Sequence, residues 1–294
     1  MTDLAPPAFR VGDFVVQQVV EFQAPFRPLA TMFPEAARDP AALEALLPRL
    51  QPWCVDEQGR AILPVQSYVI RTGRHVILID TCVGCDKTNS RFPEWAGRQD
   101  EGWLQRLQAM GMQPEQVTHV LCTHLHSDHS GWNTRLLDGR WVPTFPNARY
   151  IFAKAEVAHA EANETELYAE NVLPVIAAGQ ADLVETDHQI EDGVWLEPTP
   201  GHTPGHVAVH LVSAGRHAVM WGDLLHSPAQ ALYPHWAYAR DVSAADSTAS
   251  RWRVLGAAAE HNRLILSSHF PLPSVGRVRS EGAGFWFDYE GETR

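Results

Sequence analysis

Short apolar runs separated by turn residues recur along the chain and predict buried β-strands. Residues 75–79 form one such run, which ends in Asp80, and residues 117–122 form another. Near-continuous apolar runs are typical of strands that are buried on both faces of a sheet. Similar runs predict further strands over residues 14–20, 66–70, 207–212, 217–221, 264–266, 275–278 and 284–289.

Helical spacing of apolar residues appears between these runs. Trp103, Leu107 and Met110 recur at intervals of three to four residues, and Gly111 is a typical helix stop. Further helices are predicted over residues 153–162, 166–178 and 245–261. Because strands bracket helices in both halves of the chain, the pattern predicts an α/β fold, an αββα sandwich of two mixed β-sheets flanked by helices.

Residues 22–59 match neither the helical nor the strand period well. They carry Phe26, Met32, Phe33 and Trp53 among several prolines. We interpret residues 1–294 as a single domain and this segment as an N-terminal arm or cover. Its apolar side chains are expected to pack against the body of the protein or against a second subunit, so a homodimer is one possibility.

Composition and charge exclude several classes of partner. The 294 residues include 23 Lys and Arg against 35 Asp and Glu, a formal charge of −12, which does not favour binding to nucleic acid. No apolar run reaches the roughly 18 residues of a membrane span. The N-terminus lacks the basic start and apolar stretch of a signal peptide. These features predict a cytoplasmic protein that contacts neither nucleic acid nor membrane.

The four cysteines are Cys54, Cys82, Cys85 and Cys122. They are too few for a disulfide framework in a chain of this length. Cys82 and Cys85 form a single Cys-x-x-Cys pair, and a second pair that would complete a four-thiolate zinc site is missing from the sequence. We interpret them as a reduced pair whose role stays open.

Histidine positions indicate metal chemistry. The strand predicted over residues 117–122 is followed by three imidazoles and one carboxylate within six residues: His124, His126, Asp128 and His129. Nitrogen and oxygen donors of this kind suit zinc or a similar cation. In an extended chain His124 and His126 point the same way, so one ion can bind both. Asp128 and His129 follow closely enough to reach a second ion.

The second half of the chain supplies three further ligand-type residues. His202 lies in a Gly- and Pro-rich turn over residues 199–206, Asp223 follows a predicted strand, and His269 follows another. Each stands at the end or mouth of a strand, where rigid scaffolds present functional groups.

The order His-x-His-x-Asp-His, then Gly-His, then Asp, then His resembles the signature of the metallo-β-lactamase-fold hydrolases, over about residues 60–280. The resemblance implies this fold with two divalent ions per chain, and zinc is the expected metal. It implies that His124, His126 and His202 hold one ion, that Asp128, His129 and His269 hold the other, and that Asp223 bridges them. Asp80 matches an early acidic motif of the family, which implies that it orients a ligand histidine by accepting its N–H.

Two ions that share a hydroxide generate a nucleophile for a carbonyl or phosphoryl centre, so the sequence predicts a zinc-dependent hydrolase. Asp128 and Asp223 are the predicted catalytic carboxylates, with Asp128 as a candidate proton donor to the leaving group. The chain is most similar to the branch of N-acyl-homoserine lactonases and methyl parathion hydrolase-like enzymes, which implies a lactone or related carboxylic ester as the substrate.

Several alternatives remain open at this point. The same metal chemistry serves a phosphotriester or aryl ester hydrolase and, less well matched here, a thioesterase or a β-lactam hydrolase. A different class would be a non-catalytic metal-binding protein or an iron redox protein. Aromatic residues near the motifs are candidate contacts to a small-molecule substrate, although ordinary loop packing explains them equally well: Trp132, His226, Tyr233 and Phe270.

Overall fold

The computed structural model describes residues 8–88 and 92–291. Within these residues the strands form two seven-stranded mixed sheets, which confirm the predicted α/β fold, and one two-stranded sheet that was not predicted. The chain divides into two compact units, each built from two segments. The first unit comprises the residues up to Glu21 and Val65–His188, and the second comprises Phe22–Pro64 and the residues from Gln189 onward.

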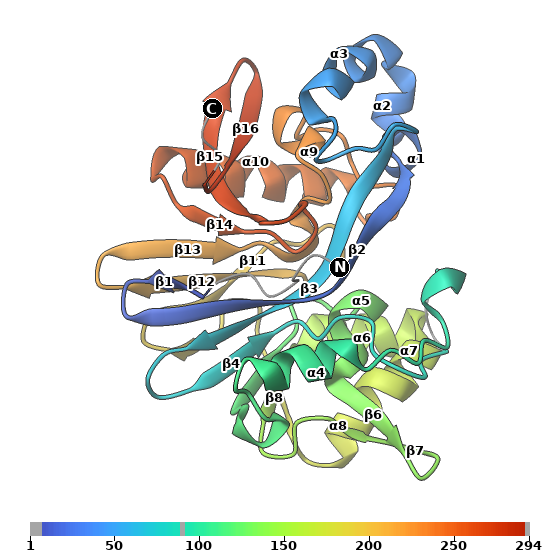
Figure 1. Cartoon of the computed structure of the whole chain (residues 1–294), viewed down its shortest axis with the longest axis vertical. Coiled ribbons are helices and arrows are strands. Elements are labelled where there is room, and N and C mark those ends of the chain that lie inside the picture. Colours follow the sequence, from blue (N-terminus) through green and yellow to red (C-terminus); the bar gives the residue numbers. More distant parts are fainter. Residues whose placement is uncertain (1–7, 89–91, 292–294) are drawn as a thin grey trace. The chain divides into compact units, whose positions relative to one another are not determined.

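The first sheet has the strand order β1-β2-β3-β4-β5-β8-β9 (Figure 1). Its strands are β1 (Phe9–Val11), β2 (Phe14–Pro28), β3 (Arg60–Arg71), β4 (Val76–Ile79), β5 (His119–Leu121), β8 (Arg149–Ala153) and β9 (Ala181–Val184). Strands β4, β5, β8 and β9 are parallel, so the chain segments that leave β4 and β5 emerge at the same sheet edge. This edge carries the histidine motif.

The remaining elements of the first unit are short. They are η1 (Pro93–Trp95), α4 (Gly102–Ala109), η2 (Pro114–Gln116), α5 (Ser127–Ser130), η3 (Gly131–Asn133), the hairpin β6 (Thr134–Leu137) and β7 (Arg140–Pro143), α6 (Lys154–Asn163), α7 (Thr165–Leu167), the π-helix η4 (Tyr168–Val172) and α8 (Leu173–Ala177). Helix α4 buries Trp103 and Leu107, which confirms the helical spacing of that segment.

The helix predicted over residues 166–178 is present as one continuous helical segment, which consists of α7, the π-helix η4 and α8. Pro174 has no N–H and cannot donate to the carbonyl of Glu170 four residues earlier. That carbonyl instead accepts from Thr134 Oγ1 at 2.5 Å and from Lys87 Nζ at 3.4 Å. The π-helix η4 thus lies directly before the proline of α8, and side chains of other segments satisfy the released acceptor.

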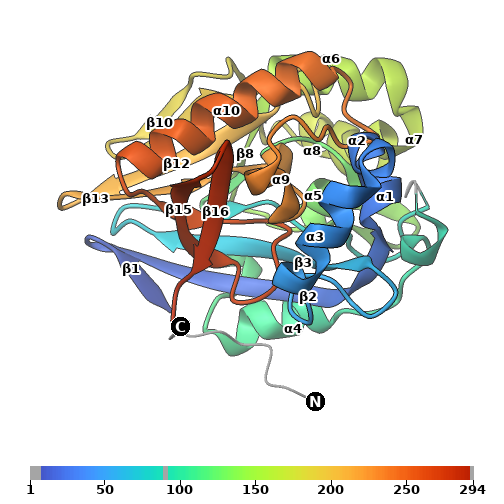
Figure 2. The same cartoon turned by 90° about the horizontal axis from the view of Figure 1, so that it is seen from above.

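The second sheet has the order β10-β11-β12-β13-β14-β15-β16. Its strands are β10 (Gln189–Glu191), β11 (Val194–Pro198), β12 (Val207–Ser213), β13 (Arg216–Met220), β14 (Leu264–Leu266), β15 (Val275–Glu281) and β16 (Gly284–Tyr289). Strands β13 and β14 are parallel, and the other neighbouring strands are antiparallel. Helix α10 (Ala244–Glu260) lies along this sheet, where Val254 and Leu255 join Val219 and Ile265 in one core cluster (Figure 2).

The segment predicted as an arm belongs to the second unit and contains three helices, α1 (Leu29–Met32), α2 (Pro34–Arg38) and α3 (Pro40–Leu50). Asp39 caps α3 by accepting from Ala42 N at 3.1 Å. The segment packs on its own unit, since Met32 O accepts from Ala239 N at 2.8 Å and the Phe33 ring stacks on Trp236. The description of the whole chain as a single domain with a covering arm stays a prediction.

Two short elements complete the second unit, η5 (Gly222–Leu224) and α9 (Ala229–Leu232). In the part of the chain that the structure describes, the helices are too short or too polar to cross a bilayer.

Candidate functional site

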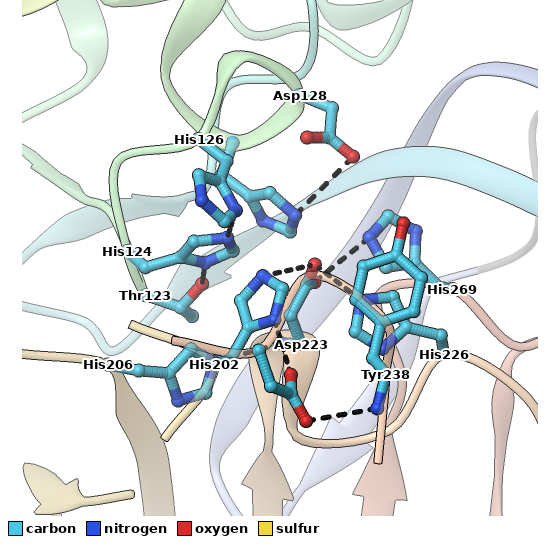
Figure 3. Close-up of polar contacts among 12 residues, drawn as sticks. Thr123, His124, His126, Asp128, His202, His206, Asp223, His226, Tyr238 and His269 are labelled. Atoms are coloured by element: carbon cyan, nitrogen blue, oxygen red, sulfur yellow. Dashed lines mark hydrogen bonds and ion pairs between the residues drawn. The ribbon is translucent and has the colours of Figure 1, made fainter. Parts of the chain in front are cut away.

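The histidine motif of the first unit forms the loop and one-turn helix that follow β5. His124 and His129 are buried, and His126 is partly exposed. His124 Nε2 lies 3.0 Å from His126 Nδ1, so the two rings present nitrogen atoms to one point (Figure 3). Two imidazole nitrogens at this distance can share a proton or bind one cation.

Asp80 connects the ends of β4 and β5. It follows β4 with a positive φ of 57°, a conformation that Asp tolerates better than most residues. One carboxylate oxygen accepts from Thr123 N at 2.7 Å, and the other accepts from His129 Nδ1 at 2.8 Å. The proton of the His129 ring is therefore held on Nδ1, and the Nε2 lone pair points toward Asp128 Oδ2 at 3.6 Å.

The loop between β4 and α4 packs tightly against the motif. A Cβ atom on Gly131 would lie 1.8 Å from Val83 O, so only glycine fits directly after α5. Glu21 accepts from Val83 N at 2.9 Å, Gly84 N at 3.2 Å and Trp132 Nε1 at 2.9 Å. Burial raises the pKa of Glu21 to about 7. No motif in the sequence pointed to Glu21, whose only signal is that it is the single acidic residue of β2.

In the second unit the three predicted ligand residues come together around one carboxylate. Asp223 follows β13 and His269 follows β14, and these parallel strands end side by side. Asp223 Oδ1 lies 2.9 Å from His269 Nε2, and Asp223 Oδ2 lies 3.3 Å from His202 Nε2 (Figure 3). All three side chains are almost fully buried.

The opposite nitrogens of these rings have acceptors. His202 Nδ1 donates to Asp241 Oδ1 at 3.0 Å, and His269 Nδ1 donates to the carbonyl of Pro64 at 2.9 Å. In a neutral ring a proton on Nδ1 leaves a lone pair on Nε2. In both residues this lone pair faces Asp223, an arrangement that is favourable only with a proton or a cation between them. The nitrogen and oxygen donors therefore fit a divalent metal such as zinc.

Asp241 is a second residue that the sequence analysis missed. Burial acts to raise its pKa, but hydrogen bonding and charge from His202, together with the charge of Arg251, outweigh burial and lower the pKa of Asp241 to about 2. The carboxylate is thus ionised and acts on His202 as Asp80 acts on His129.

His226 is a third imidazole beside Asp223. Its Nε2 lies 3.1 Å from Asp223 Oδ2, and its ring stacks on Tyr238 with centroids 3.9 Å apart. The sequence pattern suggested a substrate contact here, and the structure places the ring against Asp223, one of the predicted metal ligands.

The other predicted substrate contacts differ in environment. Phe270 is fully buried in the core cluster with Trp221 and Phe287, and Trp132 is buried and stacked on Trp103. Both rings pack inside their own units, and their contact with substrate stays a prediction. Tyr233 is partly exposed.

All four cysteines are buried thiols outside any disulfide. Cys82 Sγ lies 3.1 Å from Ser67 Oγ, and burial raises the pKa values of the Cys82 and Cys85 thiols. The Cys-x-x-Cys pair is reduced, as the sequence analysis expected, and its thiols are in an unreactive environment.

Comparison with known proteins identifies the family. The model of the metallo-beta-lactamase superfamily matches residues 61–260. An N-acyl homoserine lactonase of a Bacillus species is 30% identical over 156 residues, 49% of this chain and 56% of that protein, and one of Bacillus cereus is 29% identical over the same shares. The matched part thus spans little more than half the length of these relatives.

Two solved structures share the fold over nearly the whole chain. The hydrolase AbOPH of the beta lactamase superfamily has a TM-score of 0.82 at 23% identity and covers 100% of both chains. AidC, a dizinc quorum-quenching lactonase, has a TM-score of 0.79 at 20% identity and covers 99% of this chain and 100% of its own. With the family model matching most of its length, this chain belongs to the metallo-β-lactamase superfamily.

Proposed function

We propose that this protein is a dinuclear-metal hydrolase that opens a lactone or hydrolyses a related carboxylic ester. The observation that carries the proposal is the orientation of the predicted ligands. In each unit a buried acceptor holds Nδ1 of a histidine, so that Nε2 is directed at a carboxylate of the ligand set. A neutral histidine that only packs in a core would direct its Nε2 lone pair at a hydrogen-bond donor and not at a carboxylate.

The proposed ligand set follows the family order. His124, His126 and His202 would hold one ion, Asp128, His129 and His269 the other, and Asp223 would bind both. Zinc suits these donors, since it prefers imidazole nitrogen and carboxylate oxygen. Two zinc ions would supply a water of lowered pKa and would polarise the substrate carbonyl.

The residues of the chain have separate tasks in this proposal. Asp80 and Asp241 fix the tautomers of His129 and His202 and raise the basicity of their Nε2 atoms. Asp128, the most exposed of the ligand carboxylates at 9%, would deliver a proton to the leaving alkoxide. His226 and Tyr233 are the proposed substrate contacts.

The lactone is proposed because the curated relatives are N-acyl homoserine lactonases and because AidC was solved with a product, an acylated homoserine. A phosphotriester or aryl ester is the alternative substrate, since a metal-activated water attacks acyl and phosphoryl centres alike. The cytoplasmic location and the homodimer stay predictions.

A substrate panel tests the proposal. The zinc-loaded full chain would be assayed with N-hexanoyl homoserine lactone, an aryl ester, a phosphotriester, a thioester and a β-lactam, with metal content measured in parallel. We expect about two zinc ions per chain and the highest kcat/KM for the lactone. A chain that binds zinc but hydrolyses none of the five, or that carries redox-active iron instead, would contradict the proposal.

A further inference from the structure

Arg251 of helix α10 is a fully buried arginine at the centre of the second unit. Its Nε donates to Pro234 O at 2.9 Å, and its Nη2 donates to Thr248 Oγ1 at 3.3 Å. Its Nη1 lies 3.5 Å from Leu224 O and 3.4 Å from Asp241 Oδ2. A buried guanidinium is rare unless its charge is paired, and here the partner is the carboxylate that holds His202.

Asp241 uses its two oxygens for different tasks. Oδ1 accepts from His202 Nδ1, while Oδ2 accepts from Tyr238 N at 3.0 Å and from Arg251. With Oδ2 occupied by two donors, the carboxylate cannot rotate without losing them. The position of Oδ1, and with it the ring of His202, is therefore set by α10.

Two more contacts join the same helix region to the same residues. Leu224, whose carbonyl faces Arg251, directly follows Asp223. At the start of α10, Ser243 N donates to Gly201 O at 2.9 Å, and Val242 N donates to His202 O at 3.2 Å. A Cβ on Gly201 would lie 2.0 Å from Ser247 N, so the turn that carries His202 rests directly on the helix.

We infer that Arg251 is a positioning residue that acts through Asp241 on His202. The inference rests on the proposed function, because it takes His202 as a metal ligand. A fixed planar fork is needed to reach Pro234, Leu224 and Asp241 together, so lysine cannot replace arginine here.

The test uses four variants of the full chain: Arg251→Lys, Arg251→Met, Asp241→Asn and the double variant Arg251→Met/Asp241→Asn. The double variant removes both buried charges, so it is expected to fold even where Arg251→Met alone does not. Arg253→Met is the matched control, because Arg253 lies two residues away on α10 and pairs with Glu197 on the half-exposed side.

The first measurement is the tautomer of His202, obtained from ¹⁵N chemical shifts before and after zinc is added. We expect the Nδ1–H form alone in the wild type and in Arg253→Met, and a mixture of both neutral forms in the Arg251 and Asp241 variants. The inference would be overturned if His202 kept the wild-type tautomer in both Arg251→Lys and Arg251→Met. If Arg251→Met does not fold, the double variant takes its place in this comparison. This measurement needs no substrate, so it stands even if the lactone assignment fails.

The second measurement is the zinc dissociation constant, from competition with a chromophoric chelator. Each single variant is expected to bind zinc about 10–100-fold more weakly, the usual effect of losing a partner of a ligand histidine. The double variant is expected to be no weaker than the weaker single variant, because both residues act along one path. Losses that multiply in the double variant would show that Arg251 acts independently of Asp241 and would overturn the inference.

Discussion

His202 donates its Nδ1 hydrogen to Oδ1 of Asp241 across 3.0 Å, although the two residues lie 39 positions apart in the sequence. The first unit repeats this arrangement between His129 and Asp80, 49 positions apart, at 2.8 Å. In both pairs the carboxylate fixes the proton on Nδ1 and leaves Nε2 for a cation. Each unit therefore prepares its own histidine before any metal arrives.

Replacing Asp223 tests the ligand assignment most directly. Asp223→Ala removes the carboxylate that His202, His226 and His269 share. Loss of a hydrogen-bond partner of a ligand histidine costs about 10–100-fold, so we expect loss of a ligand itself to lower kcat/KM by more than about 100-fold. Circular dichroism should show an intact fold. Turnover near that of the wild type would contradict the dinuclear assignment.

Asp80→Asn tests the partner of His129. The amide keeps the shape but loses the charge, so zinc should bind about 10–100-fold more weakly in a chelator competition. Asp138→Asn is the matched control, since Asp138 is exposed and has a similarly positive φ of 50°, whereas Asp80 has 57°. Equal zinc affinity in the two variants would show that Asp80 does not support metal binding.

Cys82→Ser should leave zinc content and hydrolysis unchanged. The thiol is buried against Ser67, and its pKa is raised by burial, so it presents no thiolate to a metal. Metal analysis and kcat/KM on the same preparation check this. Loss of a zinc ion in this variant would show that the Cys-x-x-Cys pair contributes to the metal site.

Gly131→Ala should destabilise the protein, because the added Cβ would meet the carbonyl of Val83 at 1.8 Å. Overpacking of this kind costs about 1–3 kcal/mol in the free energy of unfolding. Gly256→Ala on α10 is the control, since its Cβ has open space and alanine favours a helix by about 1 kcal/mol. Urea denaturation should show a lower free energy of unfolding than in the wild type for Gly131→Ala and a higher one for Gly256→Ala.

Glu21 predicts a pH dependence of stability. Burial raises its pKa from the ordinary 4.5 to about 7, so between these values the folded chain keeps a proton that the unfolded chain has released. The free energy of unfolding therefore falls as the pH rises through this range. Glu21→Gln has no titrating carboxyl group at this position. Urea denaturation at pH values on both sides of this range should therefore show a smaller fall in the free energy of unfolding for the variant than for the wild type. An identical pH profile in the variant would contradict the shifted pKa.

Elements with a strong pattern were predictable from the sequence. The helix predicted over residues 245–261 is α10, Ala244–Glu260, and the strand predicted over 284–289 is β16. The strands β1 and β6 to β11 were not predicted. They are short, and in β6, β7, β9, β10 and β11 most residues are partly or fully exposed, which weakens the apolar signal.

The amino-acid sequence alone determined the family and the identity and order of the seven candidate ligands, because six of them follow strand ends that apolar runs mark and His202 lies in a distinctive Gly- and Pro-rich turn. The tertiary structure alone decided what holds them. Asp241, Arg251, Glu21 and the carbonyl of Pro64 lie far along the chain from the histidines and loops they support, and no local pattern distinguishes them from other buried or loop residues. A hydrogen bond depends on atoms meeting within about 3 Å in space, and only packing fixes that distance.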